Sequence, residues 1–180
     1  MIDCTILDAY REHYARATQE QRAQGRAWYP DATALCKSIA QETGYPWQRI
    51  ALAMAALSPR ARWEANVRAT RDAASGRTPR VLRTNALKAS ALLAGARAHD
   101  TLSGIKVRSF AAAILGYRHA ATIDAWMLRA AGHPAPAKAS GQVKYIRACK
   151  QALAQLAREV GEDTRDLQAI VWIVARGNHS

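Results

Sequence analysis

The sequence has few cysteines, few acidic residues and no long apolar run, and each shortage excludes a class of protein. Its three cysteines, Cys4, Cys36 and Cys149, lie far apart, and the chain has no CxxC pair and no Cys/His cluster. A zinc site or an iron–sulfur cluster would need such clustered ligands. We therefore expect no metal and no cofactor, and a reducing compartment fits scattered thiols best.

Membrane and β-sheet classes are excluded on similar grounds. The sequence has no apolar run long enough to span a membrane and no signal-peptide pattern at its N-terminus. Apolar and polar residues alternate over only a few positions at a time, and no internal repeat is present. Because 49% of the 180 residues are hydrophobic, the chain can bury a core. We expect a globular all-α protein in the cytoplasm.

Basic residues are abundant where acidic ones are scarce. Lys and Arg number 26 against 14 Asp and Glu, which gives a formal net charge of +12. Residues 58–88 hold eight basic and two acidic residues, and so carry half of this charge. Such a cluster favours contact with nucleic acid over the alternative of a merely solvated helix surface. The basic residues of the segment are Arg60, Arg62, Arg68, Arg71, Arg77, Arg80, Arg83 and Lys88.

Apolar residues at helical spacing predict a series of helices that glycine and proline delimit. We expect the first helix, 5–24, to end at Gly25, and the next to begin at Pro30 and end at Gly44. The helix over 46–57 has so little polar content that it should be buried on most sides. Further helices are expected at 63–75, 84–93, 106–115, from 122 or 124 onward, at 142–160 and at 164–175, with a linker at 133–141.

The stretch 102–132 organises the rest of the chain. Gly104 separates two helical patterns, at a turn where glycine can adopt positive φ without steric cost. The helix that follows begins with free backbone N–H groups beside Lys106 and Arg108, which is a favourable setting for a phosphate. Asp124 stands beyond this turn at another helix start. If the turn binds the backbone of a nucleic acid, a carboxylate at this position could act on a neighbouring sugar or base.

These residues resemble the helix-hairpin-helix DNA glycosylase superfamily. The hairpin motif is LSGIKVRSF at 102–110, and the second motif is TIDAW at 122–126. The resemblance implies two helical lobes with a cleft between them, in one compact unit. The central lobe would comprise 31–132, and the second lobe 1–30 plus 133–180. The chain also looks like a small family of phage and actinobacterial proteins without the iron–sulfur cluster that some members of the superfamily carry. This second resemblance implies a bacterial or phage-infected host cell but no activity.

The resemblance also implies a set of DNA contacts and two catalytic candidates. Asp124 would stabilise an oxocarbenium-like charge and orient water, and the alternative is that it merely caps a helix. Arg108 stands where bifunctional members have a Schiff-base lysine, and an arginine cannot be that nucleophile. Lys106, displaced by two positions, is the other candidate amine. The DNA contacts would be Ser103, Gly104, Ile105, Lys106, Arg108, Ser109, Arg60, Arg62 and Arg118.

Two more segments are similar to parts of the superfamily. In AALSPRARWEANVRAT, Arg60 falls where a residue fills the space left by an extruded base, although Arg60 and Arg62 could instead only touch phosphates. On a late helix, Gln168 and Trp172 share one face and could read and stack on a base. The alternative there is a buried Trp beside a core or capping Gln. Trp126 and His119 complete the candidate base pocket.

The function that these residues imply is monofunctional hydrolysis of the N-glycosidic bond of a damaged or modified base in double-stranded DNA, by a monomer. One alternative keeps the fold and transfers an amine or amino acid to an activated hydroxymethylpyrimidine, as in phage DNA hypermodification. The other alternative is a DNA-binding protein that has lost the chemistry.

Overall fold

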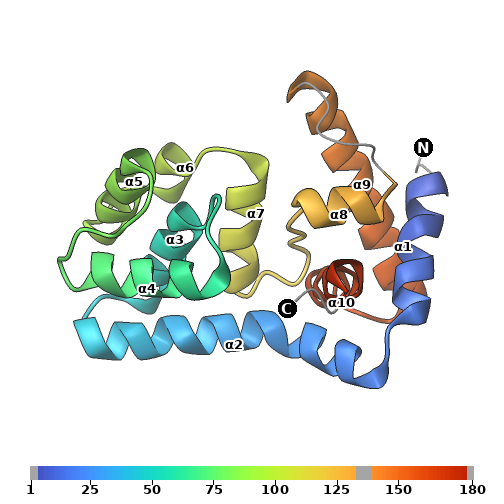
Figure 1. Ribbon diagram of the computed structural model, residues 1–180, viewed down its shortest axis with the longest axis horizontal. Helices are drawn as coiled ribbons and strands as arrows, with labels where there is room; N and C mark the ends of the chain where they lie inside the picture. Colours follow the sequence, from blue (N-terminus) through green and yellow to red (C-terminus); the bar gives the residue numbers. More distant parts are fainter. Residues whose placement is uncertain (1–3, 133–138, 178–180) are drawn as a thin grey trace. The chain divides into compact units, whose positions relative to one another are not determined.

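The computed structural model describes residues 4–132 and 139–177, and over these residues the protein is all-α. Ten helices follow one another without a strand in this part of the chain (Figure 1). The predicted all-α class is therefore confirmed. The helices are α1 Cys4–Arg16, α2 Gln19–Thr43, α3 Trp47–Leu57, α4 Trp63–Ala74, α5 Arg83–Leu93, α6 Ala98–Thr101, α7 Ile105–Ile114, α8 Ala125–Ala130, α9 Ala139–Val160 and α10 Thr164–Arg176.

The contacts between helices divide the chain into two compact units. The terminal unit comprises Met1–Pro30 and Tyr117–Ser180, and the central unit comprises Asp31–Gly116. The sequence-based division into 31–132 and the rest differs from this for residues 117–132. Those residues belong with the terminal unit because Ile123 and Met127 are buried in the same core cluster as Tyr10.

The core of the terminal unit lies among α1, α8, α9 and α10. Tyr10, Met127 and Leu153 are fully buried there, and the Tyr10 hydroxyl donates to the Met127 carbonyl at 3.1 Å. Burial raises the pKa of the Tyr10 phenol. This core therefore joins the first helix to helices more than a hundred residues further on, partly through a buried polar group.

The core of the central unit is α3, which packs against α4, α5 and α7. Seven of its eleven residues are buried, which confirms that this helix is enclosed on most sides. Alanine accounts for four of the seven, so neighbouring helices can approach it closely. No helix in the described part of the chain is long and apolar enough to cross a membrane.

The prediction that a helix ends at Gly25 is wrong. α2 runs through both Gly25 and Pro30 without a break. A Cβ atom on Gly25 would lie 2.4 Å from Ile170 Cγ1 and 2.7 Å from the Ile170 backbone nitrogen, so the glycine permits close approach of α10. The break falls earlier, where the Thr18 hydroxyl accepts from Gln21 N–H at 3.2 Å and Gln21 Oε1 accepts from Thr18 N–H at 3.0 Å. This pair is a capping box.

The other glycine stops end helices as predicted. Gly44, Gly116 and Gly161 each follow a helix with positive φ, which is the left-handed conformation of a C-terminal stop. α9 begins at Ala139, three residues before its expected start. The remainder of the predicted linker, 133–138, lies outside the described residues.

Candidate functional site

The predicted hairpin is present in the central unit. α6 ends at Thr101, and Gly104 precedes α7 with φ 85° and ψ 140°. This combination of angles is essentially restricted to glycine. Ser103, Gly104 and Lys106 are exposed, so the turn lies at the surface of the central unit. The local geometry is that of an anion site at a helix N-terminus.

Two basic side chains hold the hairpin turn together. Arg108 donates from Nε to the Leu102 carbonyl at 2.8 Å and from Nη2 to the His99 carbonyl at 3.1 Å. Lys88 Nζ donates to Ser103 Oγ at 2.6 Å. Arg108 thus satisfies backbone carbonyls at the end of α6, which fixes the turn. Of the other predicted contacts here, Ile105 is half-buried and Ser109 is buried.

The loop between α3 and α4 places two predicted DNA contacts at the surface. Arg60 and Arg62 are both exposed. Arg60 has φ 63°, and it is the one residue other than glycine with positive φ in the described part of the chain. A left-handed arginine stores backbone strain, and such strain is concentrated at functional positions.

Asp124 caps α8 in the terminal unit, and its carboxylate is hydrogen-bonded from two elements. Oδ1 accepts from the backbone N–H groups of Trp126 at 2.9 Å and Met127 at 3.0 Å. Oδ2 accepts from the indole Nε1 of Trp172, on α10, at 2.9 Å. The structure therefore brings Asp124 and Trp172 together. Three donors hold the carboxylate in one orientation, while the residue remains half-buried.

Trp172 is itself held by neighbours on two helices. The Arg176 guanidinium lies over its ring, 4.5 Å from the centroid, and the ring of Trp28 meets it edge-on at 6.0 Å. Trp28 lies on α2 and was not singled out in the sequence. Aromatic pairs and Arg–Trp stacking each contribute about 0.5–1.5 kcal/mol beyond simple burial. The indole that orients Asp124 is thus supported on more than one side.

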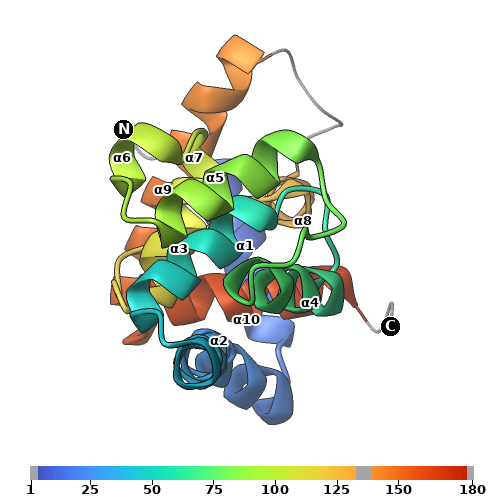
Figure 2. The ribbon, with the colours of Figure 1, turned by 90° about the vertical axis from the view of Figure 1, so that its left-hand side faces the viewer.

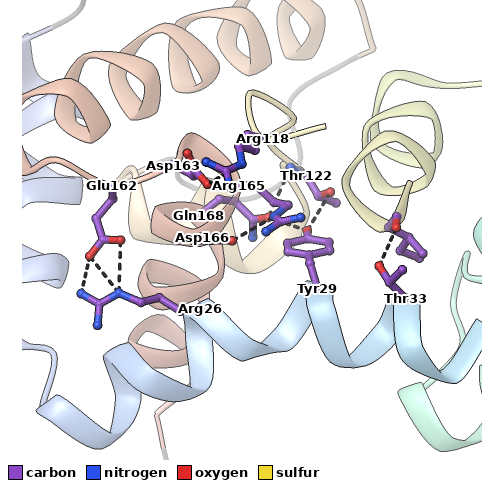
Figure 3. A network of polar contacts seen from close by, with 11 residues as sticks. Arg26, Tyr29, Thr33, Arg118, Thr122, Glu162, Asp163, Arg165, Asp166 and Gln168 are labelled. Atoms are coloured by element: carbon purple, nitrogen blue, oxygen red, sulfur yellow. Dashed lines mark hydrogen bonds and ion pairs between the residues drawn. The ribbon is translucent and has the colours of Figure 1, made fainter. Parts of the chain in front are cut away.

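Gln168 is part of a buried polar network, shown in Figure 3. Its side chain is 3% exposed, and its Oε1 accepts from the Tyr29 hydroxyl at 2.7 Å and from Thr122 N–H at 3.4 Å. The Tyr29 hydroxyl also lies 3.1 Å from Thr122 Oγ1. Burial raises the pKa of the Tyr29 phenol. Gln168 therefore joins α10 to α2 and to the segment before Asp124, as in the core-glutamine interpretation.

The remaining predicted site residues are more exposed. Arg118 Nε lies 3.4 Å from the Asp163 carboxylate, and the Arg118 carbonyl accepts from Arg165 N–H (Figure 3). His119 is exposed, and Trp126 is half-buried beneath the Arg129 guanidinium at 4.7 Å. Among the described residues, no group of three or more His, Cys, Asp or Glu side chains could hold a metal ion.

The sequence analysis missed Tyr29 and Trp28, whose partners lie more than 90 residues away. Their spacing on α2 gives a faint signal, since two adjacent aromatics precede a proline inside one helix. The capping box at 18–21 is a stronger signal, because Thr-x-x-Gln can be recognised directly. It would have placed the start of α2 correctly.

Comparison with known proteins identifies the family. The model of a family of unknown function, DUF7178, matches residues 4–179, so the chain belongs to this family. No curated protein and no solved structure matches it.

Proposed function

We propose that the protein is a DNA-binding enzyme that hydrolyses the N-glycosidic bond of an extruded base, on a two-lobed helix-hairpin-helix glycosylase-like fold. The observation that carries this proposal is the carboxylate of Asp124, which two backbone N–H groups and the Trp172 indole hold in one orientation. Preorganised charge is the largest single source of catalysis when a transition state develops charge.

The proposed chemistry needs a fixed carboxylate and a water molecule. Cleavage of the glycosidic bond develops positive charge on the sugar, and Asp124 would stabilise that charge and orient the attacking water. Lys106 is exposed at the start of α7, whereas the guanidinium of Arg108 is engaged by backbone carbonyls. Since arginine cannot form a Schiff base, water is the nucleophile in this proposal.

The proposed DNA grip is the hairpin in the central unit. The exposed turn at Gly104 and the N-terminus of α7 offer N–H groups to a phosphate, and Lys106 adds a positive charge. Arg60, strained and exposed, is the candidate to occupy the space left by the base. Extrusion of the base from the duplex costs a few kcal/mol, and the Arg60 side chain in the vacated space would partly offset this cost.

Binding without chemistry is the second candidate function, and a specific observation favours it. Both oxygens of Asp124 already accept hydrogen bonds, which is also what a helix cap with an aromatic partner requires. The two candidates make opposite predictions for a substitution that preserves the cap. Asparagine is as good a cap as aspartate but carries no charge, and with its oxygen at the cap its amide nitrogen cannot accept from the Trp172 indole.

The test is base release under single-turnover conditions from duplexes that carry damaged, deaminated or hypermodified bases, followed by mass spectrometry. Wild type would be compared with Asp124→Asn and with Asp100→Asn, an exposed carboxylate of the central unit that gives the same charge change. We expect free base from wild type and Asp100→Asn, and at least about a 100-fold slower release from Asp124→Asn at unchanged DNA affinity.

Each other outcome would change the proposal. Equal release by wild type and Asp124→Asn would remove the role of Asp124. A mass gain on an intact nucleotide would indicate a base-modifying transferase. Tight binding by all three proteins with no change in any substrate would leave the binding function alone.

A further inference from the structure

A groove in the central unit is lined by three arginines that the site described above does not use. Its volume is about 400 Å³, and it lies between α4 and the loop that follows, residues 75–82. One wall is a single face of α4, because Ala65, Arg68, Ala69 and Asp72 follow the helical spacing i, i+3, i+4, i+7. The alanines leave space between the arginines. The other lining residues are Arg77, Thr78 and Arg80.

The loop wall of this arginine groove is fixed by the way α4 ends. Gly76 has φ 74°, its N–H donates to the Ala73 carbonyl, and the Arg77 N–H donates to the Asp72 carbonyl at 2.8 Å. This double closure is a Schellman motif. Arg77 Nε also donates to Asp72 Oδ1 at 2.9 Å, and Pro79 is buried. The groove is therefore largely formed before any ligand arrives.

The charges of the groove are unequally paired. Arg77 forms an ion pair with Asp72, which is the one acidic residue among those that line the groove. Arg68 and Arg80 are exposed, and neither makes a hydrogen bond or ion pair with a described residue. Three guanidinium groups against one carboxylate leave a net charge of +2 in the groove. Guanidinium groups match the geometry of phosphate oxygens. When arginines neutralise a phosphate of DNA, the small counterions bound to that phosphate are released.

We propose that the arginine groove binds a backbone phosphate of DNA, as a second contact separate from the hairpin. The inference deepens the proposed function, since it rests on DNA as the partner. Figures 1 and 2 show the 75–82 loop and the turn before α7 on different sides of the central unit, so one phosphate cannot serve both. A duplex that reaches both would be gripped at two places along its length.

The test measures duplex affinity by fluorescence anisotropy at several salt concentrations, with the full chain. The variant is Arg68→Gln/Arg80→Gln, and the matched control is Arg16→Gln/Arg158→Gln, two exposed arginines of the terminal unit. Both variants lose two charges. We expect the groove variant to bind about tenfold or more weakly, with a slope of log affinity against log salt that is smaller by about 1, as expected for the loss of one phosphate contact, and the control to change little.

Two additions make the result specific. Arg68→Lys/Arg80→Lys keeps the charge, so most of the salt slope should return while part of the affinity stays lost. Inorganic phosphate at millimolar concentration should compete with the duplex for the groove, and so should weaken duplex binding by the wild type more than duplex binding by the groove variant. Equal losses in the groove variant and the control would overturn the proposal, because the effect would then be one of net charge. The same holds for a groove variant with unchanged affinity.

The outcome is separable from the proposed chemistry. If binding depends on the groove but no base is released, the groove proposal holds and the hydrolase proposal fails. If base is released and the groove variant binds normally, the hydrolase proposal holds and the groove proposal fails. Failure of the wild type to bind any duplex would overturn both.

Discussion

The two units are both helical, but their buried polar residues have different partners. In the terminal unit, Tyr10, Tyr29 and Gln168 are buried and hydrogen-bonded to segments far away in the sequence. In the central unit, the buried Thr70 hydroxyl donates to the Asn66 carbonyl one turn away, and the buried Asn66 Oδ1 and Asn85 Nδ2 have no hydrogen-bond partner among the described residues. A buried polar group that loses its hydrogen-bond partner is costly, whereas apolar side chains in a core can be exchanged at low cost if their volume is kept. Substitutions of similar size should therefore cost the terminal unit more.

Each unit carries a buried cysteine, which allows the two to be observed separately. Cys149 is buried in the terminal unit and Cys36 in the central unit. Burial raises the pKa of the Cys36 thiol to about 12, so it is poorly reactive while the unit is folded. Pulsed thiol labelling, read peptide by peptide, therefore reports which unit opens.

Gly25→Ala should have the largest effect. The added Cβ would meet the Ile170 backbone at 2.7 and 2.8 Å, and a backbone on a packed helix cannot give way cheaply. We expect a loss of about 3 kcal/mol in the free energy of unfolding, with Cys149 exposed before Cys36. The matched control is Gly44→Ala in the central unit, where φ is 79° and no atom lies within 4 Å of the added Cβ.

Backbone strain alone should make this Gly44→Ala control cost about 1 kcal/mol. Denaturant titration of both variants gives the difference. Equal destabilisation would show that α10 can move away from α2, and would weaken the distinction between the units.

The second largest effect should be the destabilisation of the terminal unit at alkaline pH. Burial raises the pKa of both Tyr10 and Tyr29 above the ordinary value of 10.0, so the folded unit keeps its phenol protons where the unfolded chain loses them. This contribution is fully present below pH 10 and falls as the pH rises above it. At pH 11 each tyrosine should cost about 1.4 kcal/mol. Denaturant titrations between pH 8 and 11, with Cys149 labelling as the readout, would show a flat profile if the phenols were not buried.

Tyr29→Phe tests the network directly at neutral pH. The substitution removes the donor at 2.7 Å from Gln168 Oε1 and leaves that buried oxygen with the longer bond from Thr122. We expect a loss of about 1–2 kcal/mol. The control is Tyr45→Phe in the central unit, whose hydroxyl makes no hydrogen bond with a described residue and should be nearly neutral. Thermal unfolding of both variants compares them, and an equal shift would contradict the network's role.

Arg60→Gly should have the smallest effect, and the opposite sign. Glycine relieves the left-handed backbone, so the central unit should gain about 1 kcal/mol, less the entropy that glycine loses on folding. DNA affinity should fall at the same time if the arginine reaches the nucleic acid. Chemical denaturation and anisotropy measure the two effects on the same sample. A loss of stability would mean that the side chain of Arg60, and not its strain, matters to the folded unit.

Local features of the fold could be predicted from the sequence, and long-range ones could not. The hairpin at Gly104 and the helix stops at Gly44 and Gly116 follow from residues within one turn of each position. The same local rule fails at Gly25, because the reason for that glycine is Ile170 on another helix. A glycine that ends a helix and a glycine that admits a neighbour are identical in a single sequence.

The candidate site shows the same limit. Asp124 could be placed at a helix start from its sequence neighbours, and its backbone partners follow from that position. The indole of Trp172 could not be assigned to it, since the bond spans 48 residues. The spacing of Gln168 and Trp172 was compatible with a pocket and with a core. The partners of Gln168 lie on α2 and before α8, and only the folded chain brings them together.

The division of the chain has a consequence for the order in which the protein is made. Residues 31–116 are continuous in the sequence, so every segment that makes the internal contacts of the central unit is available once residue 116 has left the ribosome. The terminal unit needs α10 against Gly25 and Tyr29, and residues 164–176 are synthesised after all of the other described helices. The first thirty residues must therefore wait for the last helix. Until then all of the central unit has been synthesised, while the terminal unit still lacks one of its helices.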